Sequence, residues 1–178
     1  MTSSSTITIP KSRYYLKGFF QTLFVLIVMV WSWENLIEER YVVGEAPDPK
    51  LAPICVNERL FLVDKLRTPA RDEFVMYSSK QIDPYVKAGT LVTKLVKGVP
   101  GDHIKVVNGE VFINGKLVDS LQSVIMDKLN TNPSDYDREL TLGPTEYWVM
   151  GYLPRSFDSR YWGPISKFQI VGKAWALW

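Results

Sequence analysis

Three segments of this 178-residue chain carry side chains suited to nucleophilic or acid–base chemistry. One holds Cys55, the only cysteine, and one holds Lys94, which precedes the turn-forming segment Gly98-Val99-Pro100-Gly101-Asp102. The third is Ser156-Phe157-Asp158-Ser159-Arg160-Tyr161-Trp162-Gly163-Pro164, which combines hydroxyl, acidic and basic groups. A thiol, with a reference pKa of about 8.5, yields a strong nucleophile on deprotonation. A lysine amine acts as a general base at neutral pH only where burial lowers its pKa well below about 10.4.

Composition excludes several classes of chemistry. The single histidine, His103, follows a Pro-Gly-Asp turn and is expected on the surface, so a histidine-based triad is not expected. One cysteine excludes an intramolecular disulfide and a thiolate metal cluster, and a metalloprotease lacks its ligands. No metal and no cofactor are therefore expected. A net charge of +2 without a basic tract argues against nucleic acid as a partner.

An uncharged apolar run, FFQTLFVLIVMVWSW, occupies residues 19–33. A bilayer-spanning helix needs roughly 20 apolar residues, so the run is marginal unless Gly18 and the interfacial Trp31 and Trp33 are counted. A buried core helix would be apolar on one face only, whereas this run is apolar all round. A cleaved signal peptide would end in small residues, which Trp31-Ser32-Trp33-Glu34 does not offer. Charged residues flank the run: Lys11, Arg13 and Lys17 before it, and Glu34, Glu38 and Glu39 after it.

These flanks predict an uncleaved signal anchor over residues 18–36. The positive-inside rule then places residues 1–17 in the cytoplasm and residues 37–178 outside, which in a bacterium is the periplasm. The expected location is the bacterial inner membrane, crossed once. Residues 34–53 are expected to form a linker or a membrane-proximal stretch without a helix, because Pro47, Pro49 and Pro53 disfavour a helix there.

The rest of the chain is predicted to be mainly β, built from short antiparallel strands. Runs rich in β-branched and aromatic residues begin at residues 59, 73 and 90, and closing strands are expected over 145–150 and 168–178. Between them, Asn108-Gly109 and Asn114-Gly115 predict tight hairpin turns, so residues 103–145 are expected to contain a β-hairpin lobe. A short helix is expected near 123–129. Strands separated by turns, without alternating helices, argue against a βαβ fold.

The segments Gly98–Asp102 and Ser156–Gly163 resemble the signature boxes of type I signal peptidases, membrane-bound serine/lysine peptidases that trim exported proteins. The Ser-Phe-Asp-Ser-Arg-Tyr-x-Gly-Pro form is closest to the conjugative-transfer branch, which processes pilin precursors. The resemblance implies that Lys94, four residues before Gly98, is the general base; Lys97 is the alternative, and faces the opposite side of the strand. It also implies that Ser156 orients the Lys94 amine. Asp158 and Arg160 would then form a supporting ion pair.

In the same alignment the family's nucleophilic serine falls on Cys55. No serine lies between Trp33 and Ser78, and Thr68 is too far into the strand region. A Cys55 thioester would react readily with amines, which favours transpeptidation and cyclisation besides hydrolysis. Pro53 stands where housekeeping members carry a hydroxyl donor for the oxyanion hole, which leaves the Cys55 backbone N–H as donor. The alternative is that Cys55 is a small buried hydrophobe and the protein a degenerate homologue.

These expectations describe a membrane-anchored endopeptidase that removes the leader or a terminal segment of an exported precursor. The predicted substrate is a conjugative pilin precursor, with general preprotein trimming second. Its partners would be that precursor, inner-membrane lipid and other proteins of the conjugation apparatus. The competing hypothesis is a non-catalytic scaffold of a conjugation or type IV secretion apparatus that keeps the fold without a working dyad.

Overall fold

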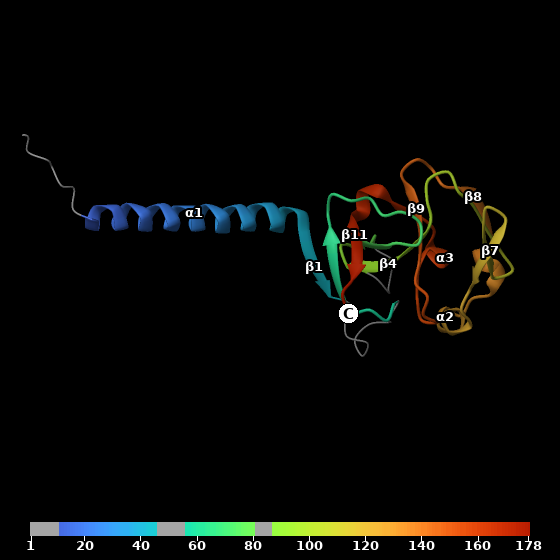
Figure 1. The fold of residues 1–178 in the computed structure, drawn as a ribbon. Helices are drawn as coiled ribbons and strands as arrows, with labels where there is room; N and C mark the ends of the chain where they lie inside the picture. The colour runs from blue at the N-terminus through green and yellow to red at the C-terminus, as the bar shows by residue number, and fades with distance from the viewer. Residues whose placement is uncertain (1–10, 46–55, 81–86) are drawn as a thin grey trace, which may run out of the picture. The chain divides into compact units, whose positions relative to one another are not determined.

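The computed structural model describes residues 11–45, 56–80 and 87–178, and their side chains from Tyr15 onward. Cys55 and Pro53 lie outside the described residues. The chain divides into two compact units, one ending at Arg40 and one running from Tyr41 to Trp178 (Figure 1). Each unit is described below by itself.

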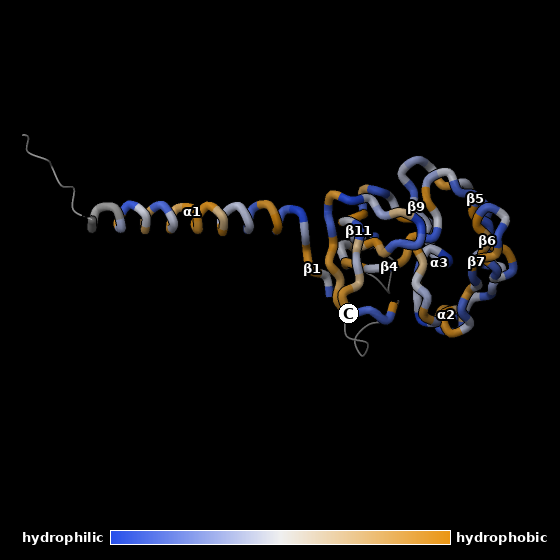
Figure 2. Tube along the Cα trace, in the orientation of Figure 1, coloured by the Kyte–Doolittle hydropathy of each residue, from blue (hydrophilic) through white to orange (hydrophobic). Residues whose placement is uncertain are grey.

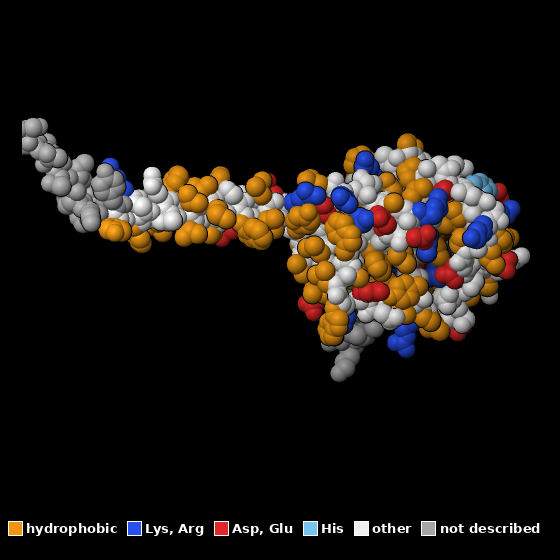
Figure 3. Space-filling model, viewed as in Figure 1, with side chains coloured by type: hydrophobic (Ala, Val, Ile, Leu, Met, Phe, Trp, Pro, Cys, Tyr) orange, Lys and Arg blue, Asp and Glu red, His pale blue; other side chains and the backbone are white. Residues whose placement is uncertain are grey.

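The first unit is the helix α1 (Lys11–Arg40). Its segment Tyr15–Arg40 is 26 residues and, at 1.5 Å per residue, about 39 Å long, and it contains an 18-residue window with a mean hydropathy of 1.5. The segment is long and apolar enough to cross a membrane. Hydrophobic residues recur along its middle (Figure 2), and hydrophobic side chains are spread along the face that is visible in the space-filling view (Figure 3). Within this helix Thr22 Oγ1 donates to the Gly18 carbonyl at 2.6 Å, so its hydroxyl has a partner without water.

The expected linker over residues 34–53 is corrected in its first part. Residues 34–40 continue α1, and residues 41–45 form the strand β1 (Tyr41–Glu45), which pairs with β2. The physical reason lies in the composition of these residues. Glu34 to Arg40 are mostly good helix formers, and Tyr41-Val42-Val43 favours a strand, while the first proline of the stretch, Pro47, comes later.

The second unit is built around a seven-stranded antiparallel sheet in the order β1-β2-β11-β3-β4-β9-β10. Strand β11 lies between β2 and β3, although it follows them by nearly a hundred residues or more: Lys173 of β11 pairs with both Asp64 and Val75. The strands after β1 are β2 (Leu60–Asp64), β3 (Phe74–Ser78), β4 (Leu91–Gly98), β9 (Glu146–Met150), β10 (Ile165–Ser166) and β11 (Ile170–Ala176).

Between β4 and β9 the chain leaves this sheet and forms a lobe, residues 103–141, around a second antiparallel sheet in the order β7-β6-β5-β8 (Figure 1). Its strands are β5 (His103–Val107), β6 (Glu110–Ile113), β7 (Lys116–Ser120) and β8 (Arg138–Thr141). The lobe also holds α2 (Ser123–Leu129) and the 3₁₀ turn η1 (Pro133–Tyr136). Two short elements near the C-terminus complete the unit: α3 (Ser159–Trp162) and the 3₁₀ turn η2 (Lys167–Gln169).

The predicted mainly β, antiparallel fold with one N-terminal apolar helix is confirmed. The two Asn-Gly pairs occupy the β5–β6 and β6–β7 turns, with φ of 49° and 82° at Asn108-Gly109 and 51° and 77° at Asn114-Gly115. Positive φ at both central residues is what a two-residue type I′ hairpin requires. The helix expected near 123–129 is α2.

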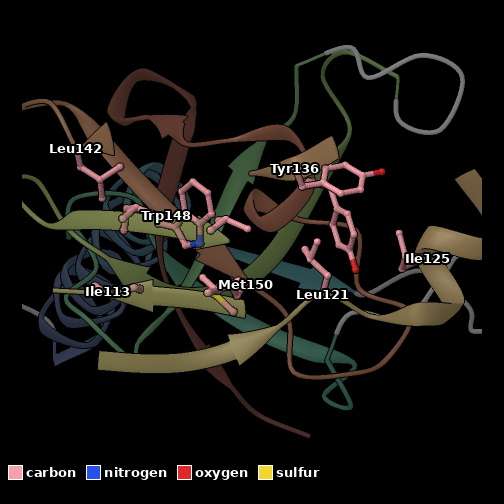
Figure 4. Packing of buried hydrophobic residues seen from close by; sticks show 11 residues of the cluster. Ile113, Leu121, Ile125, Tyr136, Leu142, Trp148 and Met150 are labelled. Carbon is pink, nitrogen blue, oxygen red and sulfur yellow. The ribbon is translucent and has the colours of Figure 1, made fainter. Parts of the chain in front are cut away.

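A buried apolar cluster joins the lobe to the larger sheet (Figure 4). Trp148 and Met150 enter it from β9, and Tyr161 enters it from α3. Leu142 follows directly after the lobe, and the lobe supplies the remaining members: Ile104, Val106, Val111, Ile113, Leu121, Ile125 and Tyr136. Because interiors pack as densely as organic crystals, this cluster fixes the lobe against β9 and α3, the two elements that flank the site described below.

Gly172 should be intolerant of a side chain. A Cβ there would lie 2.3 Å from the Asp64 carbonyl oxygen and 2.9 Å from Lys65 Cα, both backbone atoms that cannot turn aside. We expect Gly172→Ala to separate β11 from the end of β2 and lower the free energy of unfolding by about 3 kcal/mol. Urea unfolding of the full chain in detergent measures this. Gly18→Ala, where an added methyl meets no atom within 4 Å, is the control; equal stability of both variants would contradict the packing argument.

Candidate active site

Lys94 is a buried lysine in the middle of β4, with 1% of its surface exposed. Its cross-strand partner on β3 is Val75, and Val92 and Val96 flank it on the same face of the strand. Lys97, three residues on, lies on the other side and pairs with the exposed Asp72 at 2.7 Å. Of the two lysines considered from the sequence, Lys94 is thus the one surrounded by apolar side chains.

The Lys94 amine meets Ser156 in the interior of the domain. Lys94 Nζ donates to Ser156 Oγ at 2.9 Å, and Ser156 is fully buried. The Ser156 hydroxyl in turn donates to Asp158 Oδ2 at 2.5 Å. Since a hydroxyl has a single proton, this bond leaves Ser156 only lone pairs to offer to Lys94.

Asp158 receives hydrogen bonds from four directions although it is fully buried. Besides the Ser156 hydroxyl, its carboxylate accepts the Gly151 N–H at 2.9 Å and the Arg160 backbone N–H at 3.2 Å. The Arg160 side chain adds a two-pronged contact, with Nε and Nη2 each 2.8 Å from a carboxylate oxygen. As the residue before α3, Asp158 also caps the first turn of that helix.

Burial by itself raises the pKa of Asp158, but its bonds outweigh that effect. The hydrogen bonds and charge of Arg160, the nearby Lys94 and the Ser156 hydroxyl together hold the pKa of this carboxyl below its ordinary value of 3.8. Asp158 is therefore an anion across the physiological range. The same pairing raises the pKa of Arg160 against the opposing effect of its own burial.

The arginine also reaches the lobe. Arg160, 1% exposed, donates from Nη1 to Asp119 Oδ2 at 2.9 Å and to the Ser120 carbonyl at 3.1 Å, both at the end of β7. From Nη2 it also donates to the Gly151 carbonyl at 3.1 Å. No sequence motif pointed to Asp119, because the contact is between residues 41 positions apart that only the fold brings together.

The structure therefore brings together four of the five residues singled out from the sequence: Lys94, Ser156, Asp158 and Arg160. The fifth, Cys55, lies outside the described residues, but the residues that follow it are described. Val56 is buried, the Asn57 backbone N–H donates to the Tyr152 hydroxyl at 2.7 Å, and that hydroxyl donates to Glu58 at 2.6 Å. Tyr152 belongs to the loop between β9 and Ser156, and its role was not predicted from the sequence either.

Comparison with known proteins identifies the family. The family described as "Signal peptidase, peptidase S26" matches residues 14–178. A signal peptidase I P from Bacillus subtilis subsp. natto is 30% identical over 166 residues, covering 85% of this chain and 83% of the relative. A probable signal peptidase I-2 from Synechocystis is 27% identical over 159 residues, covering 86% and 69%. The crystal structure of a signal peptidase I from Enterococcus faecalis is 25% identical, with a TM-score of 0.40 over 60% of this chain and 97% of that one.

A mainly β domain with a buried lysine–serine pair and an apolar N-terminal helix agrees with the sequence matches, which decide the assignment. The chain belongs to the signal peptidase family, peptidase S26. In activity class it is a membrane peptidase like signal peptidase I.

The Asp158 carboxylate should make the stability of the domain depend on pH. Its pKa is lowered by folding, so its contribution is complete above its ordinary value of 3.8 and is lost as the pH falls through that value and below. We expect Asp158→Asn to be less stable at pH 7 by about 3 kcal/mol, since Arg160 loses a buried partner. The variant should also lose less stability than wild type as the pH falls below about 4.

Urea unfolding of the full chain in detergent at a series of pH values measures both effects. Asp127→Asn, an exposed aspartate of α2, is the matched control and should follow wild type. Parallel curves for wild type and Asp158→Asn would contradict the prediction.

Proposed function

We propose that this protein is a membrane-anchored endopeptidase in which Cys55 is the nucleophile, Lys94 the general base and Ser156 the residue that orients the lysine. Its substrate is an exported precursor, from which it removes a leader or terminal segment. The observation that carries this proposal is the pairing of a buried lysine amine with a buried hydroxyl 2.9 Å away. Burying a lysine amine among valines costs free energy, because its charged form loses hydration. Such a lysine is therefore expected to have a function.

The direction of the hydrogen bonds suits a base. Because the Ser156 proton is engaged by Asp158, Ser156 accepts one N–H of Lys94 and makes no demand on the lone pair of a neutral amine. That lone pair stays available for another donor, and Ser156 limits rotation of the amine. In the described part of the chain Ser156 Oγ is the hydrogen-bond partner of Lys94 Nζ.

The proposed reaction begins with transfer of the Cys55 thiol proton to Lys94. The sulfur attacks the carbonyl carbon of the scissile peptide, and the C–N bond then breaks as the amine leaves with the proton from Lys94. The fragment on the N-terminal side of the cut, which carries the scissile carbonyl, remains bound to Cys55 as a thioester. Water attacking this thioester gives a linear product, whereas an amine of the precursor gives a new peptide bond; either way the thiol is regenerated.

The chain just after Cys55 supports the assignment. Tyr152 binds Asn57 and Glu58 and belongs to the loop that leads into Ser156, so the flank of the proposed nucleophile is attached to the loop of the site. Partial burial and the hydrogen bond to Glu58 raise the pKa of Tyr152, which keeps the proton that it donates. The hydroxyl thus accepts from one residue of the flank and donates to the next.

The proposed substrate class is the pilin precursor of a conjugation system, with general preprotein trimming second. The support is the Ser-Phe-Asp-Ser-Arg-Tyr-Trp-Gly-Pro segment at residues 156–164, which resembles the conjugative branch, and the thioester chemistry that a cysteine offers. The positive charges of Lys11, Arg13 and Lys17, which precede the apolar run within α1, support an N-terminus in the cytoplasm and a catalytic unit on the periplasmic side of the inner membrane.

The test is intact mass spectrometry of two precursors, each co-expressed with this protein. One is a conjugative pilin precursor, and the other is a secretory precursor with an Ala-x-Ala cleavage site. We expect wild type to process the pilin precursor, and Cys55→Ala and Lys94→Ala to leave it intact while remaining folded. A product one water lighter than the linear chain identifies cyclisation, and the linear mass identifies hydrolysis.

Cys55→Ser separates the role of the thiol from that of the position. If the Cys55→Ser variant cleaves the precursor but yields only linear product, the result supports the thioester route to cyclisation. Equal processing by wild type, Cys55→Ala and Lys94→Ala would reject the proposed dyad and leave the scaffold hypothesis. Processing of the secretory precursor alone would replace the pilin assignment with preprotein trimming.

Tyr152→Phe should impair processing without unfolding the protein. The change removes one oxygen from a side chain that is 44% exposed, so the domain should keep its stability to within about 1 kcal/mol. Asn57 and Glu58 lose their shared partner, and we expect kcat to fall by about tenfold, because a nucleophile displaced by about an ångström loses much of its rate. Tyr147→Phe, with the same chemistry on β9, is the control. Unchanged kcat in Tyr152→Phe would contradict this role.

A further inference from the structure

Asp119 is the residue of the lobe that binds the buried Arg160, and it has no role in the function proposed so far. It lies on β7, in the lobe inserted between β4 and β9, and its side chain is 33% exposed. One carboxylate oxygen accepts Arg160 Nη1 at 2.9 Å, and the other accepts the Ser120 backbone N–H at 2.7 Å. The second bond holds the carboxylate in place on its own strand.

Each N–H donor of the Arg160 guanidinium has an acceptor, and Asp119 binds the end that faces away from Asp158. Of its five N–H donors, Nε and one Nη2 proton go to Asp158, and the other Nη2 proton goes to the Gly151 carbonyl. The two Nη1 protons go to Asp119 and the Ser120 carbonyl. Asp119 is thus the one acceptor with a full charge on the side of the guanidinium that faces away from Asp158.

A planar guanidinium held at both ends cannot turn about the Cδ–Nε bond without losing charged hydrogen bonds. That orientation fixes the Asp158 carboxylate, which receives the Ser156 proton, and Ser156 receives Lys94. The contacts therefore form an unbroken series from the lobe to the lysine: Asp119, Arg160, Asp158, Ser156 and Lys94.

We propose that Asp119 is a positioning residue of the peptidase, through which the inserted lobe sets the orientation of Lys94. This inference rests on the proposed function, since it assigns Lys94 the role of base. Asp119 itself touches neither the nucleophile nor the amine, and acts through Arg160, Asp158 and Ser156.

The test compares Asp119→Asn and Asp119→Glu with wild type in the full-length protein in detergent. Asp119→Asn should lower kcat about tenfold with KM unchanged, because a misplaced base loses rate while the binding of substrate is unaffected. Asp119→Glu, which restores the carboxylate, should recover part of kcat. Asp127→Asn, an equal change of charge on α2 of the same lobe, should match wild type.

A readout independent of activity is the ¹³Cε resonance of Lys94, assigned by its loss in Lys94→Arg. We expect its chemical shift in Asp119→Asn to differ from that in wild type, because the amine is no longer held in the same orientation, and to return toward the wild-type value in Asp119→Glu. An unchanged chemical shift and an unchanged kcat, with Lys94→Ala inactive, would overturn the inference and keep the proposed function. A changed chemical shift with equal processing by wild type and Lys94→Ala would reject the proposed function while keeping the link from Asp119 to the lysine.

Discussion

The second unit depends on a buried carboxylate that is fully enclosed by donors. Asp158 is inaccessible to water, yet it receives a hydroxyl, two backbone N–H groups and a two-pronged arginine. A buried charge is tolerated only when such partners compensate for its lost hydration. Gly151, Ser156 and Arg160 must therefore keep their places for Asp158 to stay where it is, and the loop between β9 and α3 has one low-energy shape as a result.

The strand arrangement explains how two distant segments share one site. Strands β4 and β9 are neighbours in the larger sheet, and Leu95 pairs with Met150, although the whole lobe lies between them in sequence. Lys94 is thus carried into the interior by β4, while the loop after β9 brings Ser156 to its amine. Closing a long insertion costs little more than closing a short one, because the entropy of a loop grows only slowly with its length.

The sequence predicted the local features well and the tertiary contacts poorly. Asn108-Gly109 and Asn114-Gly115 need positive φ whatever surrounds them, so their turns follow from residue type. The environment of Lys94 is different: its burial depends on Val75 from another strand and on the loop after β9, which no pattern around residue 94 encodes. The Asp119–Arg160 and Tyr152–Glu58 contacts belong to the same group. The strand β1 was missed because the prolines downstream suggested a linker.

The central place of β11 imposes an order on assembly. It lies between β2 and β3, and the Trp178 carbonyl accepts the N–H groups of Arg59 and Leu60. During synthesis from the N-terminus, β2 and β3 are made first and have no partner between them until residues 170–176 follow. Contacts over such sequence separations form late and slow folding. The larger sheet, which includes the strand that carries Lys94, is therefore complete only after β11 has been made and inserted between strands that preceded it by most of the length of the second unit.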